Sequence, residues 1–127
     1  MELKKYIIRK IEYLINEKAE KAGAAEYTPK IEILVNPKNN TVDISVKIDD
    51  EDMPFNIEVC IIGYYEFNNM ENNHEIMLKN NGVAILMPYI RAIISQITSM
   101  AGLGTLTIPI INVKEMNEKA KEDYVKI

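Results

Sequence analysis

An unbroken two-residue alternation between residues 42 and 48 constrains the fold more than any other feature of this chain. The apolar positions are Val42, Ile44, Val46 and Ile48, and the residues between them are Asp43, Ser45 and Lys47. Successive side chains of a β-strand point to opposite faces, so this pattern predicts a strand with one buried and one wet face. Strands of this kind typically belong to an antiparallel sheet that is covered on one side.

The neighbouring segments extend this sheet. Ile31, Ile33 and Val35 alternate up to residues 36–40, Asn-Pro-Lys-Asn-Asn, which favour a tight turn and predict a hairpin. After an acidic turn at 49–52, alternation resumes at Phe55, and by Ile62 both faces of that strand are apolar. Residues 3–17 fit both a helical period and a period of two, and we favour a strand there.

The second half of the chain predicts helices. The asparagine-rich segment 68–73 should cap a short helix that ends near Gly82, and Pro88 suits the first turn of a longer one. A wide apolar stripe follows at Tyr89, Ile90, Ile93, Ile94, Ile97, Met100 and Ala101.

Gly102 is typical of a helix end, and Asn112 with Glu115 resembles a capping box that opens a last helix. Residues 1–127 thus predict a single α+β domain: a four-stranded antiparallel sheet with helices packed on one face.

Charge and composition narrow the classes of function. The formal charge is −4, and the 15 basic residues are interleaved with 19 acidic ones, so we expect no nucleic-acid partner. The single cysteine, Cys60, excludes an internal disulfide and agrees with a reducing compartment. The N-terminal apolar run is only two residues long, and the run from Val83 to Tyr89 is far shorter than the roughly 20 residues of a membrane span. We therefore expect a cytoplasmic protein without membrane insertion.

The side chains that commonly act in catalysis or bind metals form no catalytic pattern. His74 has no second histidine or cysteine at ligand spacing, which argues against a metal site. Cys60 has no histidine partner in the sequence and is better explained as a small buried apolar residue. Gly102-Leu-Gly104 follows a helix rather than a strand, unlike a dinucleotide-binding loop. We expect no cofactor and no enzyme activity.

Five segments, whose order and spacing agree, resemble the SecB family of protein-export chaperones, and Ile97–Met100 (ITSM) is one of them. Phe55–Phe67 (FNIEVCIIGYYEF) resembles the family's fourth strand, and Leu86–Arg91 (LMPYIR) is similar to the Leu-Phe-Pro-Tyr-Ala-Arg that starts its long helix. Residues 104–113 follow the family's Gly-Thr…Leu…Pro-Val-Asn loop. Tyr27–Ile31 resembles its Trp-x-Pro-x-Val, with tyrosine in place of tryptophan. The resemblance runs from about residue 27 to residue 124.

The chain departs from the family at three places. The family has paired glycines where this chain has Ile62-Gly63, and its first strand aligns here only with a gap. The family's polar C-terminal tail, which helps SecB contact the motor SecA, has no counterpart in these 127 residues. We therefore expect this chain to share client binding with the family more readily than coupling to SecA.

The resemblance implies ATP-independent holding of unfolded or precursor polypeptides by a homo-oligomer, a dimer of dimers. SecA and the antitoxin of a toxin–antitoxin system are the two candidate partners beyond the client. Three other readings stay open: a SecB-like chaperone of a toxin–antitoxin system, a small-molecule-binding α+β domain, and a purely structural oligomeric subunit.

Candidate residues follow for each surface. Apolar and aromatic side chains suit sequence-tolerant client binding, and the candidates are Tyr27, Tyr64, Tyr65, Phe67, Leu106, Ile108 and Ile110. For each aromatic residue taken alone, core packing is the favoured alternative. By resemblance, Asn56 and Glu58 match the face that docks SecA, with a plain solvated strand face as the alternative. The predicted oligomer interface, for which core packing is the alternative, comprises Ile57, Val59, Ile61, Ile90, Ile93, Ile94 and Ile97.

Overall fold

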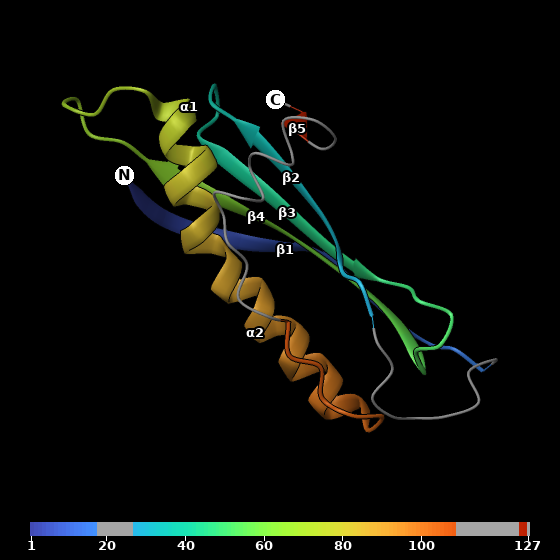
Figure 1. The fold of residues 1–127 in the computed structure, drawn as a ribbon. Coiled ribbons are helices and arrows are strands. Elements are labelled where there is room, and N and C mark those ends of the chain that lie inside the picture. Colours follow the sequence, from blue (N-terminus) through green and yellow to red (C-terminus); the bar gives the residue numbers. More distant parts are fainter. Residues whose placement is uncertain (18–26, 109–124, 127) are drawn as a thin grey trace.

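A computed structural model describes residues 1–17, 27–108 and 125–126 of the chain, which form one sheet backed by one long helix (Figure 1). The strands are β1 (Glu2–Ile15), β2 (Lys30–Asn36), β3 (Thr41–Ile48), β4 (Phe55–Glu66) and β5 (Val125–Lys126). Their order in the sheet is β1-β4-β3-β2-β5. The first four pair antiparallel, which confirms the predicted sheet, and the two-residue β5 adds a parallel pairing to β2.

The β2–β3 hairpin forms where the asparagine-rich turn predicted it. The side-chain oxygen of Asn36 accepts hydrogen bonds from the backbone N–H groups of Lys38 and Asn39, at 3.0 and 3.1 Å. Asn40 takes a left-handed conformation with φ of 55°, which asparagine tolerates better than most residues. The resulting register sets Ile33 opposite Ile44, so both side chains point into the core.

β1 is a strand, as we favoured, and it lies at the edge of the sheet beside β4. Its pairing with β4 shifts register twice, between Leu3 and Lys5 and between Ile8 and Lys10. Each shift adds one residue to β1. Paired residues share a face, so the side chains of β1 on the helix-covered side are Leu3, Tyr6, Ile8, Ile11, Tyr13 and Ile15.

The helical part corrects two sequence predictions. We expected one helix to end near Gly82 and another to begin at Pro88, but the chain is helical throughout His74–Ala101. α1 (His74–Met77) passes through a π-helical turn, η1 (Leu78–Gly82), into α2 (Val83–Ala101). Gly82 has helical angles, and Pro88 lies inside α2.

Two local features let the helix continue through these residues. Tyr65 donates its hydroxyl hydrogen to the carbonyl of Gly82, which anchors the π-helical turn to the sheet. Pro88 offers no N–H to the carbonyl four residues earlier, but Pro88 and Ala84 are both exposed, so water can reach that carbonyl. Gly102 ends α2 in the left-handed conformation with φ of 88°, which confirms the predicted stop.

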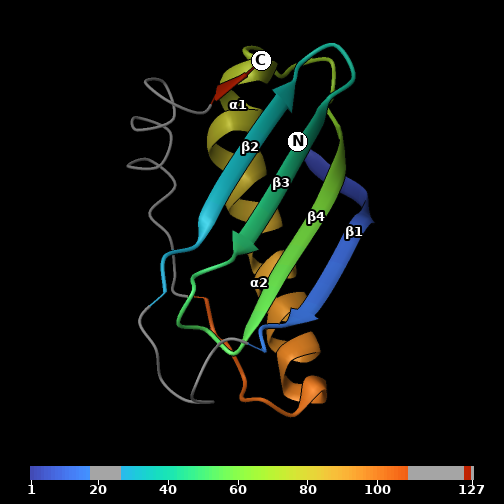
Figure 2. The same ribbon diagram turned by 90° about the vertical axis from the view of Figure 1, so that its right-hand side faces the viewer.

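The core lies between α2 and one face of the sheet (Figure 2). Its fully buried side chains include Ile44, Phe55, Ile61, Leu86, Ile90 and Ile94. Gly63 lets the helix approach, because an added Cβ there would lie 3.1 Å from a methyl group of Leu86. The last helix expected from Asn112 lies outside the described residues.

Candidate client-binding and assembly surfaces

The face of the sheet that α2 does not cover carries charged residues in pairs. Arg9 Nη1 lies 2.9 Å from Asp43 Oδ1, and Lys10 Nζ lies 2.5 Å from Glu58 Oε1. The hydrogen bond and charge of Glu58 raise the pKa of Lys10. The structure places both predicted docking residues, Glu58 and Asn56, on the uncovered face, where they are half-buried.

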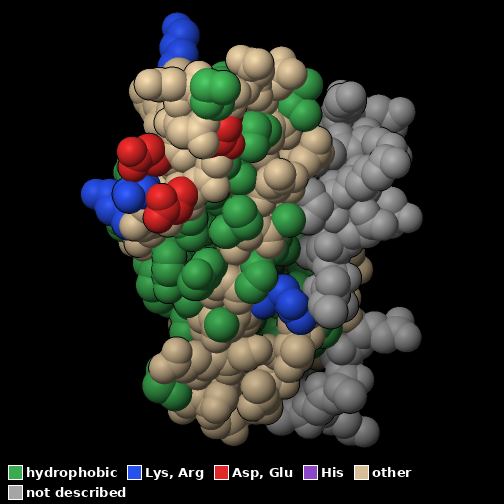
Figure 3. Space-filling view, turned by 90° about the vertical axis from the view of Figure 1, so that its left-hand side faces the viewer, with side chains coloured by type: hydrophobic (Ala, Val, Ile, Leu, Met, Phe, Trp, Pro, Cys, Tyr) green, Lys and Arg blue, Asp and Glu red, His purple; other side chains and the backbone are tan. Residues whose placement is uncertain are grey.

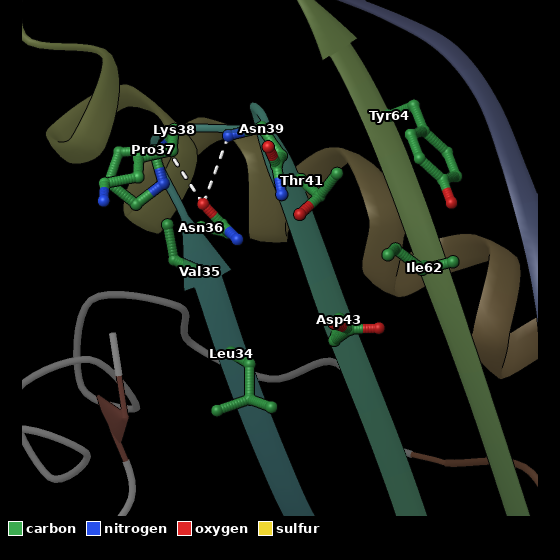
Figure 4. A pocket seen from close by; sticks show the side chains of 10 residues that line it. All are labelled: Leu34, Val35, Asn36, Pro37, Lys38, Asn39, Thr41, Asp43, Ile62 and Tyr64. Carbon is green, nitrogen blue, oxygen red and sulfur yellow. Dashed lines mark hydrogen bonds between the residues drawn. The ribbon is translucent and has the colours of Figure 1, made fainter.

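A hollow of about 770 Å³ lies at the hairpin end of this uncovered face (Figure 4). Leu34, Asp43 and Ile62 extend from three adjacent strands to form its floor, and Tyr64 stands beside them. The ammonium of Lys5 lies 5.1 Å from the centre of the Tyr64 ring, a cation–π geometry. Tyr64 therefore belongs to the uncovered face.

Tyr65, the next residue, points the opposite way and is buried beneath the helix. Burial raises the pKa of its hydroxyl well above the ordinary value of 10.0. Tyr64 and Tyr65 lie on opposite faces of β4, so they cannot line one client groove as the sequence predicted.

The remaining described residues of the predicted client set are also dispersed. Leu106 and Ile108 are 8% and 0% exposed and pack into the core. Phe67 stacks on His74 with ring centres 3.9 Å apart, at the loop that leads into α1. Tyr27 is half-buried, and Ile110 lies outside the described residues. Sequence patterns identified these side chains as apolar but did not separate buried from accessible ones.

Most of the predicted oligomer contacts are buried within the chain itself. Ile57, Val59 and Ile61 are at most 2% exposed, and Ile90 and Ile94 are fully buried. These five side chains are not accessible to a second copy. They belong to the core, which was the alternative that the sequence left open. Ile93 and Ile97 are only partly buried, at the rim of the core.

The accessible apolar surface lies instead between β1 and α2, and we call it the β1–α2 surface. Figure 3 shows hydrophobic side chains gathered on this side of the molecule. It comprises Tyr6, Ile8, Ile11, Ile15, Ile85, Tyr89 and Met100, with Ile93 and Ile97 at its inner edge. The rings of Tyr6 and Tyr89, whose centres are 4.8 Å apart, join the strand to the helix.

Individual apolar side chains of this surface have large exposed fractions. Ile11, Ile15 and Met100 are 48%, 66% and 73% exposed. Contiguous apolar surface on a folded chain typically marks a binding or assembly site. We predicted a strand at residues 3–17 but named none of them as candidate site residues, although their density of isoleucine and tyrosine was a usable signal.

By length and composition alone, the helical segment His74–Ala101 could cross a membrane. In the most apolar part of this segment, 33% is buried inside the protein. Core helices of soluble proteins meet the same criterion, and this one packs on the sheet. Among the described residues, no three His, Cys, Asp or Glu side chains gather as metal ligands would.

Comparisons with known proteins agree with this fold. The structure of the SecB-like chaperone Rv1957 of Mycobacterium tuberculosis, in complex with a ChAD peptide from the antitoxin HigA1, matches with a TM-score of 0.62. The two chains are 14% identical, and the match covers 87% of this chain and 90% of that one. An uncharacterized protein of Methanocaldococcus jannaschii is 30% identical over 92% of this chain and 82% of its own length. The family model described as preprotein translocase subunit SecB matches residues 10–123, and the chain therefore belongs to the SecB family.

Proposed function

We propose that this protein is an ATP-independent chaperone that holds non-native polypeptides in the cytoplasm. Its membership of the SecB family supports a chaperone role rather than an enzymatic one. The β1–α2 surface is the observation that carries the proposal, because it is apolar and accessible. Apolar area without fixed polar groups suits clients that share hydrophobicity but no sequence.

Assembly is part of the proposal. β1 is an edge strand of the sheet, and an uncovered edge with apolar neighbours can pair with a second chain. We propose that copies associate through the β1–α2 surface and form a dimer or a dimer of dimers. Client grooves would then lie between copies, and several weak contacts along one extended client would add up to firm binding.

The proposed clients are unfolded or precursor polypeptides. The structural neighbour from Mycobacterium tuberculosis contains a peptide from an antitoxin, which supports binding of polypeptide segments by this fold. In one version the client passes to SecA, which docks on the uncovered face at Asn56 and Glu58. In the other version the client is itself an antitoxin that the chain protects. Identification of the protein that leaves the complex with the client would separate these two versions.

Light scattering of a protein that aggregates on dilution from denaturant tests the proposal. We expect the purified chain, without ATP, to suppress the scattering at about one oligomer per client, with its mass measured in the same buffer. The variant Ile11→Asp should lose both assembly and suppression, and Ile7→Asp, on the other face of the strand, should keep both. A well-folded wild-type oligomer that leaves the aggregation unchanged would overturn the holding function.

A further inference from the structure

An extended segment of the chain is held on α2 by side chains that bind its backbone. We call residues 105–108 the strap. Thr98 Oγ1 accepts a hydrogen bond from the N–H of Leu106 at 2.8 Å, and Ser95 Oγ donates one to the carbonyl of Leu106 at 3.1 Å. Arg91 Nε donates to the carbonyl of Ile108 at 2.9 Å. These three helical side chains therefore bind the strap through main-chain atoms that every peptide possesses.

The side chains of the strap alternate like those of a strand. Thr105 and Thr107 are exposed, whereas Leu106 and Ile108 are buried in the core. Tyr27, from the segment before β2, donates its hydroxyl hydrogen to the carbonyl of Thr107 at 3.1 Å. The strap is thus seated between α2 and Tyr27 as a bound peptide would be, with two aliphatic anchors and backbone hydrogen bonds.

We propose that this seat is a client-binding site, and that an extended segment with aliphatic residues at positions i and i+2 enters it by displacing the strap. The inference rests on the proposed holding function and adds a preference within it. The seat contacts the backbone through Arg91, Ser95 and Thr98, so it does not depend on the client's exact sequence.

Displacement is an exchange rather than a net loss of core packing. Leaving the seat exposes the side chains of Leu106 and Ile108, and the entering segment buries two aliphatic side chains in their place. The strap is therefore an internal competitor that lowers the apparent affinity of the seat for clients. A client without paired aliphatic residues cannot restore the burial and is rejected.

Peptide binding to strap variants tests the inference. The probe is a fluorescein-labelled peptide that carries Gly-Thr-Leu-Thr-Ile, the sequence of residues 104–108, between soluble flanks. The variant Ile108→Val weakens the strap but leaves the seat and the peptide unchanged. Loss of one buried methylene destabilises by an amount equivalent to a twofold to tenfold change, so we expect the peptide to bind about that much more tightly.

Two controls isolate the effect. Thr107→Ala changes an exposed side chain of the same strap and should leave the affinity of the peptide unchanged. A peptide with serine in place of both aliphatic residues should bind neither protein. A photoreactive group on the peptide should cross-link to the helical segment that holds Arg91, Ser95 and Thr98, and more strongly in Ile108→Val.

The outcomes separate this inference from the proposed function. Equal or weaker peptide binding by folded Ile108→Val would overturn the strap as a competitor, even where the wild type still suppresses aggregation. Suppression of aggregation without any peptide binding would overturn the seat alone. Failure of the wild type to hold any non-native protein would overturn the chaperone proposal, whatever the peptide does.

Discussion

Replacement of Ile11 by aspartate should separate assembly from folding. Ile11 lies on the helix-covered side of β1 opposite Val59, and 48% of its surface is exposed. Full burial of an isoleucine side chain contributes about 1.5–3 kcal/mol, so covering the exposed half adds about 1 kcal/mol per copy. In a two-fold interface both copies contribute, which makes about 2 kcal/mol.

Loss of that burial weakens a dimer roughly 30-fold, and the buried carboxylate adds to the loss. We therefore expect the dissociation constant of Ile11→Asp, measured by sedimentation over a concentration series, to rise by at least that factor. The matched control is Ile7→Asp, because Ile7 is 44% exposed on the same strand but pairs with Ile62 on the uncovered face. Circular dichroism should show both variants folded.

Two results would refute this reasoning. Unchanged assembly of Ile11→Asp would show that copies do not meet at the β1–α2 surface. A larger effect of Ile7→Asp would place the interface on the uncovered face of the sheet. In either case the client grooves that we propose between copies would have to lie elsewhere.

Three further predictions concern stability. Tyr65→Phe removes a buried hydrogen bond to the helix backbone, and we expect urea titration to show a loss of about 1–2 kcal/mol in the free energy of unfolding. An unchanged free energy of unfolding would mean that the carbonyl finds another donor. Gly63→Ala forces a Cβ against Leu86 of α2 and Leu3 of β1, so thermal unfolding should show a loss of about 1–3 kcal/mol, and an unchanged midpoint would mean that these neighbours can shift. The hydrogen bond from Lys30 lowers the pKa of Asp49 below its ordinary value of 3.8. A lowered folded-state pKa stabilises the fold above the unfolded-state value and loses this effect as the pH falls through the folded-state value. Asp49→Asn should therefore be less stable than the wild type at neutral pH, with the difference vanishing as the pH falls through the folded-state pKa of Asp49, whereas a difference that grows in acid would contradict the assignment.

The sheet could be predicted where its alternation was regular, and β1 shows why regularity matters. Its helix-side residues fall at 3, 6, 8, 11, 13 and 15, because the two register shifts each add one residue. Steps of three mixed with steps of two imitate both a helix and a strand. Pairing with β4, which no local pattern contains, decides between them.

The helix boundaries were wrong for a different reason. Proline and glycine usually interrupt helices, but here the neighbourhood compensates. Gly82 is held from the sheet by Tyr65, and Pro88 is exposed, so its missing hydrogen bond costs little. Tertiary contacts of this kind are invisible to local rules.

The candidate sites show the limit of reading function from apolar residues. The sequence identified the apolar side chains of β4, α2 and the strap, but in the structure most of them form the core. Whether an apolar side chain is buried depends on which face of its strand or helix packs against the next layer. The accessible apolar surface is therefore known only once the layers are assembled. For that reason the β1–α2 surface and the strap contacts of Arg91, Ser95 and Thr98 appeared only in the structure.

The most direct test of the proposed function is co-sedimentation with a permanently unfolded polypeptide. The chain, without nucleotide, is mixed with a fluorescently labelled protein that is reduced and alkylated so that it cannot refold, and in parallel with the same protein in its native form. We expect the unfolded form alone to sediment with the oligomer of this chain. Sedimentation of neither form, or of both equally, would contradict a chaperone that recognises the non-native state.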